Sequence, residues 1–291
     1  MNGRWWKQLK VLCRSRKPLR FSLVFLTLAL LICWAAPLLG GDPNAIDVSN
    51  AFQGVSLAHP LGTDELGRDC LLRTLYGGRV SMGIGIAAML ASTGIGVALG
   101  MCSGYMGGAF DVVLMGLVEV LASVPWMLMV VAVQMLFKRG LTALLLIIVL
   151  LGWGETARLV RNQTRTARGF EYVEYARLCN VPTGAVLLKH IMPACAPTIL
   201  VSAGTQAARA ILLESTLSFL NLGIQPPGTS WGSLLQGAQK YLMKAPLQAF
   251  VPGLLIVVTV YSINELANAV SFVADPRNAE ERHVEKRNPA H

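Results

Sequence analysis

Charged side chains are scarce in this sequence. Asp, Glu, Lys and Arg make up 14% of the 291 residues, whereas 54% are hydrophobic and the mean hydropathy is +0.53. A water-soluble domain of ordinary composition carries about 25% charged residues. The composition therefore predicts that the solvent of this chain is the lipid bilayer, and it argues against an ordinary water-soluble enzyme.

Motifs of nucleotide and metal binding are also missing. The sequence has no GxxxxGK[ST], no HExxH, and no CxxC spacing among its six cysteines. We therefore expect no nucleotide site, no metal site and no catalytic residue in this chain, and we expect buried, inert thiols. Four residues of one loop match no metal-ligand spacing: His59, Asp64, Glu65 and Asp69. An intramembrane hydrolase and a passive channel remain disfavoured alternatives.

Long apolar runs are what the sequence has in abundance. A bilayer core of about 30 Å is crossed by about 20 mostly apolar helical residues. Six runs meet this requirement, at 21–39, 80–103, 111–137, 141–157, 197–222 and 246–273. We predict an all-α membrane protein with six transmembrane helices, the third of them kinked by Pro125. A cleaved signal peptide is the alternative for the first run, but its length favours a membrane helix.

The distribution of Lys and Arg predicts the orientation of these helices. The amino-terminal tail holds seven of them, the segment between the fourth and fifth runs six, and the carboxyl-terminal tail four, whereas the three opposite loops hold three, two and two. By the positive-inside rule, both termini and the segment 158–195 are expected in the cytoplasm. This asymmetry accounts for much of the net charge of +9, so we expect no nucleic-acid partner.

The predicted organisation follows from the runs and the charges. It comprises a basic cytoplasmic segment 1–20, a first transmembrane helix 21–39, an extracytoplasmic loop 40–79, a five-helix core 80–273 and a cytoplasmic tail 274–291. Within the core, 158–195 is a long polar stretch, and it contains the sequence EYVEYARLCNVPTGAVLLKHIMP from Glu171 to Pro193.

The local pattern of this polar stretch predicts a helix, a turn and a second helix. Apolar residues at helical spacing from Ala167 indicate an amphipathic first helix. It should end near Asn180, because Asn tolerates the left-handed backbone conformation and Val181 precedes a proline. Thr183 is expected to cap the second helix and Pro193 to end it. This pattern is compatible with a protruding element that binds another protein, and equally with a plain connector that lies against the bilayer.

The same stretch resembles the EAA signature of the inner-membrane subunits of bacterial ABC importers. That signature reads Glu-Ala-Ala, three residues, Gly, nine residues, Ile, one residue, Leu-Pro. Glu174, Ala176 and Pro193 fall at its spacing, while Tyr175, Asn180, His190 and Met192 replace its first Ala, its Gly, its Ile and its Leu. Asn in place of Gly still allows a turn, at some conformational cost.

Two further stretches resemble the dipeptide, oligopeptide and nickel branch of that family. They are HPLGTDELGRD at 59–69 and ESTLSFLNLGIQPPGTSWGSLL at 214–235, with VPGLL and ADPRN near the end of the chain. The resemblance implies a type I permease fold in a bacterial inner membrane, of the kind that serves as the second permease of a pair. It implies no cofactor in this chain, and ATP and Mg on partner ATPase subunits. The implied partners are a homologous permease, two ATPase subunits and an extracytoplasmic binding protein. Short peptides, and nickel or a metal chelate, remain open as substrates.

Candidate functional residues fall into three groups. For contact with an ATPase we predict that Glu171, Glu174 and Arg177 make charged contacts and that Phe170 and Val173 fill its groove. The resemblance adds Ala176, Asn180, His190 and Pro193. Ionisable residues within apolar runs usually face the bundle interior or water, and the candidates are Glu119, Arg209, Glu214 and Glu265. For Glu214 we favour bonding between helices, and for Arg209 ion pairing and a place in the pathway both remain open. Small residues at four-residue intervals predict close helix packing at Gly96, Gly100 and Gly104.

Overall fold

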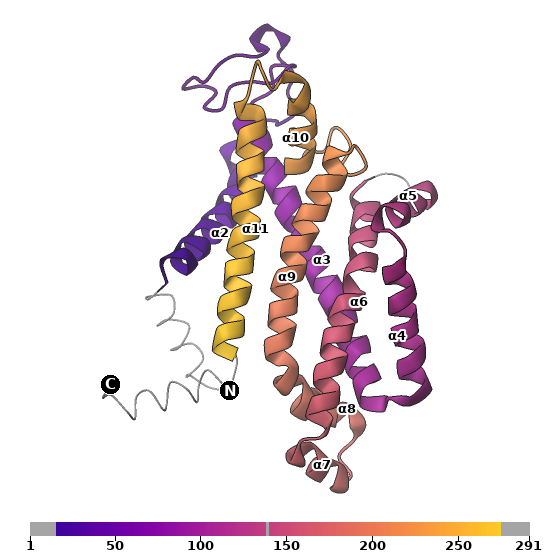
Figure 1. Cartoon of the computed structure of the whole chain (residues 1–291). Helices are drawn as coiled ribbons and strands as arrows, with labels where there is room; N and C mark the ends of the chain where they lie inside the picture. Colours follow the sequence, from indigo (N-terminus) through magenta and orange to yellow (C-terminus); the bar gives the residue numbers. More distant parts are fainter. Residues whose placement is uncertain (1–15, 138–139, 275–291) are drawn as a thin grey trace, which may run out of the picture.

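The computed structural model describes residues 16–137 and 140–274 (Figure 1). Most of the expected basic segment 1–20, and all of the expected tail 274–291 except Ala274, lie outside the described residues. Within the described part the secondary structure is helical, apart from one isolated bridge between Thr63 and Asp69.

Five helices are long and apolar enough to cross a membrane, and a bent pair of helices forms a sixth span if it is counted as one. The five spans contain α2 (Lys17–Ala35), α3 (Cys70–Met106), α6 (Leu141–Arg168), α9 (Met192–Phe219) and α11 (Leu247–Ala274), and the bent pair is α4 (Gly108–Ser123) with α5 (Trp126–Leu136). Shorter elements are η1 (Ala36–Leu39), η2 (Val48–Asn50), α7 (Glu171–Leu178), α8 (Thr183–Val186), η3 (Leu187–Ile191), α10 (Trp231–Ala238) and η4 (Gln239–Tyr241). With the bent pair counted as one span, the prediction of an all-α membrane protein with six spans is confirmed.

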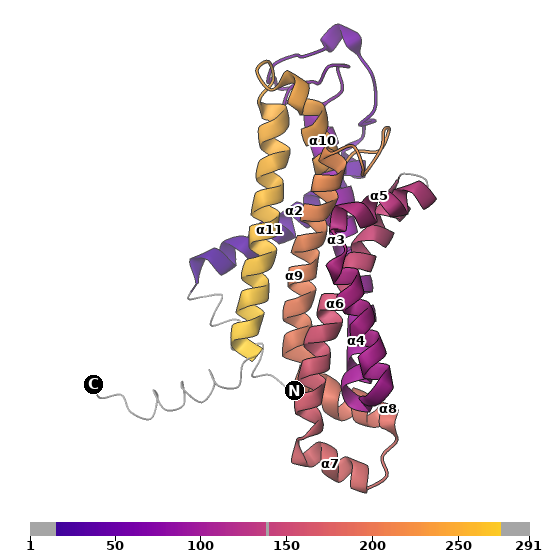
Figure 2. The same cartoon turned by 45° about the vertical axis from the view of Figure 1, so that its right-hand side comes forward.

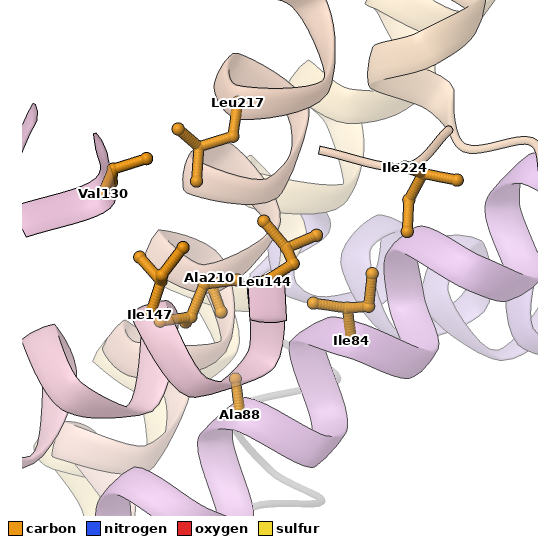
Figure 3. Close-up of a cluster of buried hydrophobic side chains, with 9 residues drawn as sticks. Ile84, Ala88, Val130, Leu144, Ile147, Ala210, Leu217 and Ile224 are labelled. Atoms are coloured by element: carbon orange, nitrogen blue, oxygen red, sulfur yellow. The ribbon is translucent and has the colours of Figure 1, made fainter. Parts of the chain in front are cut away.

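The long helices pack into one bundle. Helix α3 lies against α6 and α9, and α11 lies against α9 and α2. Figure 3 shows the apolar cluster at the centre, where Ile84 of α3, Leu144 and Ile147 of α6, and Leu217 of α9 meet. Helix α10 lies at one end of the bundle with the loop that precedes α3, and α7 and α8 lie at the opposite end (Figures 1 and 2).

The third span is broken rather than kinked, so the expectation of one helix bent at Pro125 is wrong. Helix α4 ends at Ser123, and α5 starts at Trp126 at an angle of 95°. Val124 and Pro125 both have extended ψ values, 127° and 125°. A proline disfavours helical conformation in the residue before it and cannot donate its own hydrogen bond, so the helix ends and restarts here.

The loop that precedes α3 is a folded cap, and α3 begins ten residues earlier than the apolar run predicted. Asp69 caps the helix, accepting a hydrogen bond from the backbone N–H of Leu72 at 2.7 Å. Gly62 and Gly67 both have a φ of +73°, a conformation that glycine adopts without steric cost. At Gly67 a Cβ would lie 1.7 Å from the backbone oxygen of Asp47, so a side chain would not fit.

The second helix of the polar stretch continues into the membrane, so the prediction that Pro193 ends it is wrong. Residues Thr183–Phe219 form one continuous helical span that contains α8, η3 and α9. Pro193 lies in the first turn of α9, directly after the π-helical turn η3, where the hydrogen-bond pattern changes from π to α and the missing N–H is accommodated. The capping role expected of Thr183 is also wrong, because Pro182 occupies the N-cap position and no side chain caps this end.

The cysteines follow the expectation of burial only in part. Cys33, Cys70 and Cys195 are buried, Cys102 is half-buried and Cys179 is exposed. Cys179 is exposed because it is the first residue after α7, at the tip of the polar stretch.

Candidate functional site

Helix α7 lies folded back against the end of the bundle. Val173 and Ala176 are buried on its inner face, in a cluster with Val186, Ile191 and Cys195. Val186 of α8 and Ile191 of η3 lie at the start of the span that follows α7, and Cys195 lies in α9 of the same span. The amphipathic pattern therefore anchors α7 to its own chain.

The outer face of α7 carries the charges. Glu171, Glu174 and Arg177 are exposed, and Phe170 is 39% exposed. The prediction that Val173 fills a groove on an ATPase is wrong, because this side chain is completely buried inside the chain. Of the two apolar residues proposed for that contact, only Phe170 can reach a partner. Its ring lies 5.6 Å from that of Tyr172, which is also exposed.

The turn after α7 has the conformation expected from its asparagine. Asn180 has a φ of +55°, and its backbone N–H donates to the carbonyl of Arg177 at 3.0 Å. The helix ends at Leu178, and Val181 leads into Pro182. The prediction that Asn180 marks the end of the first helix is confirmed.

Arginines surround the base of this segment. Arg165, Arg168 and Arg177 line a shallow cavity of about 350 Å³ together with Gly104 and Glu174. The Arg168 guanidinium donates to the backbone carbonyl of Tyr105 at 2.8 Å, which ties the end of α6 to the end of α3. His190 lies in η3 with its ring 6.4 Å from that of Tyr172, and Pro193 is exposed.

Glu214 is the most deeply buried of the ionisable residues predicted within the spans. Its side chain in α9 accepts hydrogen bonds from the hydroxyl groups of Ser81 at 2.7 Å and Ser218 at 2.8 Å. The Ser81 hydroxyl also accepts the backbone N–H of Trp231 at 3.1 Å. The carboxylate thus joins α9 to α3 and, through Ser81, to α10.

Arg209 forms an ion pair with Glu155 of α6, which is not among the candidate residues predicted from the sequence. The side chains are 52% and 46% exposed, although both lie on spanning helices. Glu119 of α4 is exposed and Glu265 of α11 is half-buried. The structure brings none of these four predicted residues together with another of the set. Glu155 could have been predicted in the same way as Arg209, because each is a charged residue inside an apolar run.

A second missed ion pair joins α4 to α6. Asp111 is buried and accepts hydrogen bonds from the Arg161 guanidinium and from the hydroxyl group of Ser103. The sharp turn at Gly107 and Gly108, both at positive φ, brings the start of α4 back toward the end of α3. Arg161 was counted only as part of the cytoplasmic charge, because its partner is 50 residues away in sequence.

The predicted glycine stripe lies where α3 packs closely against α6. A Cβ on Gly96, Gly100 or Gly104 would lie 2.7 Å or less from a backbone oxygen of α6. Helix backbones can approach this closely only where side chains are absent.

Three of the four polar residues singled out in the loop before α3 form ion pairs, with one another or with an arginine. His59 lies 2.7 Å from Asp69, and Asp64 accepts from Arg68 at 2.7 Å. Glu65 is exposed. No group of three or more metal-ligating side chains is found in the part of the chain that the structure describes.

Known proteins resemble this chain along most of its length. Residues 96–279 match the family described as binding-protein-dependent transport system inner membrane component. The oligopeptide transport system permease protein OppC of Haemophilus influenzae is 35% identical over 262 residues, which cover 89% of this chain and 82% of that protein. The dipeptide transport system permease protein DppC of Bacillus subtilis is 36% identical over 223 residues, covering 76% and 70%. The glutathione transport system permease protein GsiD of Pectobacterium atrosepticum is 32% identical over 274 residues.

The resemblance noted from the sequence is confirmed by these matches. Together with the membrane-spanning helices, they identify a multi-pass protein of the bacterial inner membrane with the permease fold of ABC importers. The chain belongs to the family of binding-protein-dependent transport system inner membrane components.

Proposed function

We propose that this chain is one of the two permease subunits of an ATP-driven importer of short peptides. The observation that carries the proposal is the two-sided character of α7, whose apolar face is anchored to its own chain while its charged face is exposed. The chain has no nucleotide-binding motif of its own. A segment of this kind fits a role in receiving mechanical work from a separate ATPase. Phe170, Glu171, Glu174 and Arg177 would make the contact, with Asn180 holding the turn.

The topology proposed with this function has α7 and both termini in the cytoplasm, and the cap formed by residues 40–69 outside the cell. It is supported by the excess of Lys and Arg around α7. The proposed complex contains a second, homologous permease, two ATPase subunits that bind ATP and Mg, and an extracytoplasmic binding protein that delivers the substrate. No catalytic residue is assigned to this chain.

The proposed cargo is a di- or oligopeptide. The relatives described above are named for oligopeptides, dipeptides and glutathione, and these names favour a peptide over nickel or a metal chelate. Peptide length is left to the binding protein, since no residue of this chain argues for a particular length.

Uptake by cells that lack only this chain tests the cargo. A labelled dipeptide and tripeptide are compared with radioactive nickel, supplied free and chelated. We expect peptide uptake to be lost and to return with the wild-type gene, while nickel uptake is unchanged. Loss of nickel uptake alone would contradict the peptide proposal.

Charge reversal at Glu174 tests the ATPase contact. We expect Glu174→Lys to reduce copurification of the ATPase about tenfold or more, because like charges placed in an interface repel and the side chain makes no buried contact that folding requires. Glu65→Lys is the matched control, an exposed glutamate in the outward cap. Equal ATPase copurification with both variants would rule out this role for the outer face of α7.

A further inference from the structure

The ion pair of Arg209 and Glu155 lies deep in the membrane-spanning part of the molecule. Arg209 is ten residues before the end of α9 at Phe219, and Glu155 is fourteen residues after the start of α6 at Leu141. At a rise of 1.5 Å per residue these are roughly 15 and 21 Å from the outward helix ends. Arg209 is therefore near the middle of a bilayer core of about 30 Å, and Glu155 lies in its cytoplasmic half.

The pair is unusual because it is not shielded by the protein. About half of each side chain is exposed, 52% for Arg209 and 46% for Glu155, whereas Glu214 on the same helix is completely buried. An exposed charge facing lipid is costly, so ionisable residues in spanning helices face a water-filled cavity or another polar surface. The exposed side of this pair therefore faces the aqueous route or the second permease, and not the lipid.

Two cavities meet at Glu155. One, of about 600 Å³, is lined by hydroxyl and amide side chains in addition to Glu155, among them Gln163, Thr205 and Gln206. The other, of about 760 Å³, is lined by Glu155, Arg158 and Arg209, with Trp126 and Trp153. Each volume lies within the range of about 300–1,000 Å³ that is usual for small-molecule sites.

The charges at this junction do not balance. Arg158 lies one helical turn from Glu155 and forms no ion pair with any residue in 16–137 or 140–274. Two guanidinium groups therefore lie beside one carboxylate, and the site keeps a spare positive charge. A free peptide carries a carboxylate at one end and an ammonium group at the other, so both charges at the junction have a counterpart in the cargo.

We infer that Arg209 and Glu155 form a transient binding site for the two charged ends of a peptide in the translocation pathway, and that Arg158 adds to the attraction for the carboxylate. In the empty permease the two side chains neutralise each other, which lowers the free-energy cost of removing their charges from water. When a peptide arrives, Arg209 exchanges Glu155 for the peptide carboxylate, and Glu155 takes the ammonium group. One ion pair is broken and two are formed in this exchange, so a zwitterion can pass without crossing the membrane unpaired. This inference rests on the proposed function.

Peptide uptake by complemented cells tests this transient binding site. The variants are Arg209→Gln, Glu155→Gln, and the double exchange Glu155→Arg with Arg209→Glu. Arg79→Gln is the matched control, an exposed arginine of α3 that lines neither cavity. We expect each single variant to lower the rate of tripeptide uptake about tenfold or more while the ATPase still copurifies, because charge-assisted bonds to the peptide are lost. The control should stay within about twofold of the wild type.

The double exchange separates a substrate site from a structural pair. It keeps an ion pair but reverses its polarity relative to the peptide that the binding protein delivers, so we expect uptake to stay low even though the complex assembles. Uptake restored to the wild-type rate, or single variants with undiminished uptake, would overturn the inference and leave the proposed function standing. Failure of the wild-type gene itself to restore peptide uptake would overturn the proposed function, and the inference with it.

Discussion

Replacing Gly100 by valine is expected to destabilise the packing of α3 against α6. A Cβ at this position would lie 2.5 Å from the backbone oxygen of Ala157 and 3.1 Å from its Cα. Backbone atoms cannot rotate away as a side chain can, so the two helices would have to move apart along their whole contact. Overpacking of this kind costs about 1–3 kcal/mol and at times more, and here we expect the upper end or beyond.

A valine at Gly94 is the matched control for this prediction. Gly94 lies on the same helix and is exposed, and a Cβ there would meet nothing within 4 Å. The two variants add the same side chain to the same helix, so a difference between them reports the α3–α6 contact alone. The midpoint of thermal unfolding in detergent and the fraction of monodisperse protein are the measurements. If both variants behaved alike, the close contact of the two backbones would be wrong.

Replacing Glu214 by alanine is expected to destabilise the junction of α3, α9 and α10. The change removes the acceptor for the Ser81 and Ser218 hydroxyl groups and leaves a cavity in a completely buried position. Lost hydrogen bonds to a buried acceptor and the new cavity together cost about 2–4 kcal/mol. The free energy of unfolding should therefore fall, and proteolysis should become faster near Trp231, whose backbone N–H reaches the same network.

Glu119→Ala provides the comparison for Glu214→Ala, because it removes the same group from an exposed position on α4. We expect this variant to change stability by no more than about 0.5 kcal/mol. Glu214→Gln should fall between the two, since the amide oxygen can still accept one of the hydroxyl groups. A Glu214→Ala protein as stable as the wild type would show that the buried network does not hold this junction together.

Features that depend on neighbours in sequence were predictable from the residues. The six spans follow from apolar runs, and the turn at Asn180 follows from its backbone preference. The errors in helix boundaries occurred where a local rule has more than one outcome. A proline can bend a helix, end it or lie in its first turn, and Pro125 and Pro193 each took an outcome other than the expected one.

What the sequence determined by itself is that this chain is an all-α membrane protein with a polar, amphipathic segment between its fourth and fifth spans. Hydropathy and charge act on each segment separately, so these properties need no knowledge of the fold. Only the tertiary structure decided that Val173 faces inward, that Glu155 is the partner of Arg209, and that Asp111 is the partner of Arg161. Each of these depends on which helices pack side by side, because side chains 50 or more residues apart in sequence pair only after the bundle has formed.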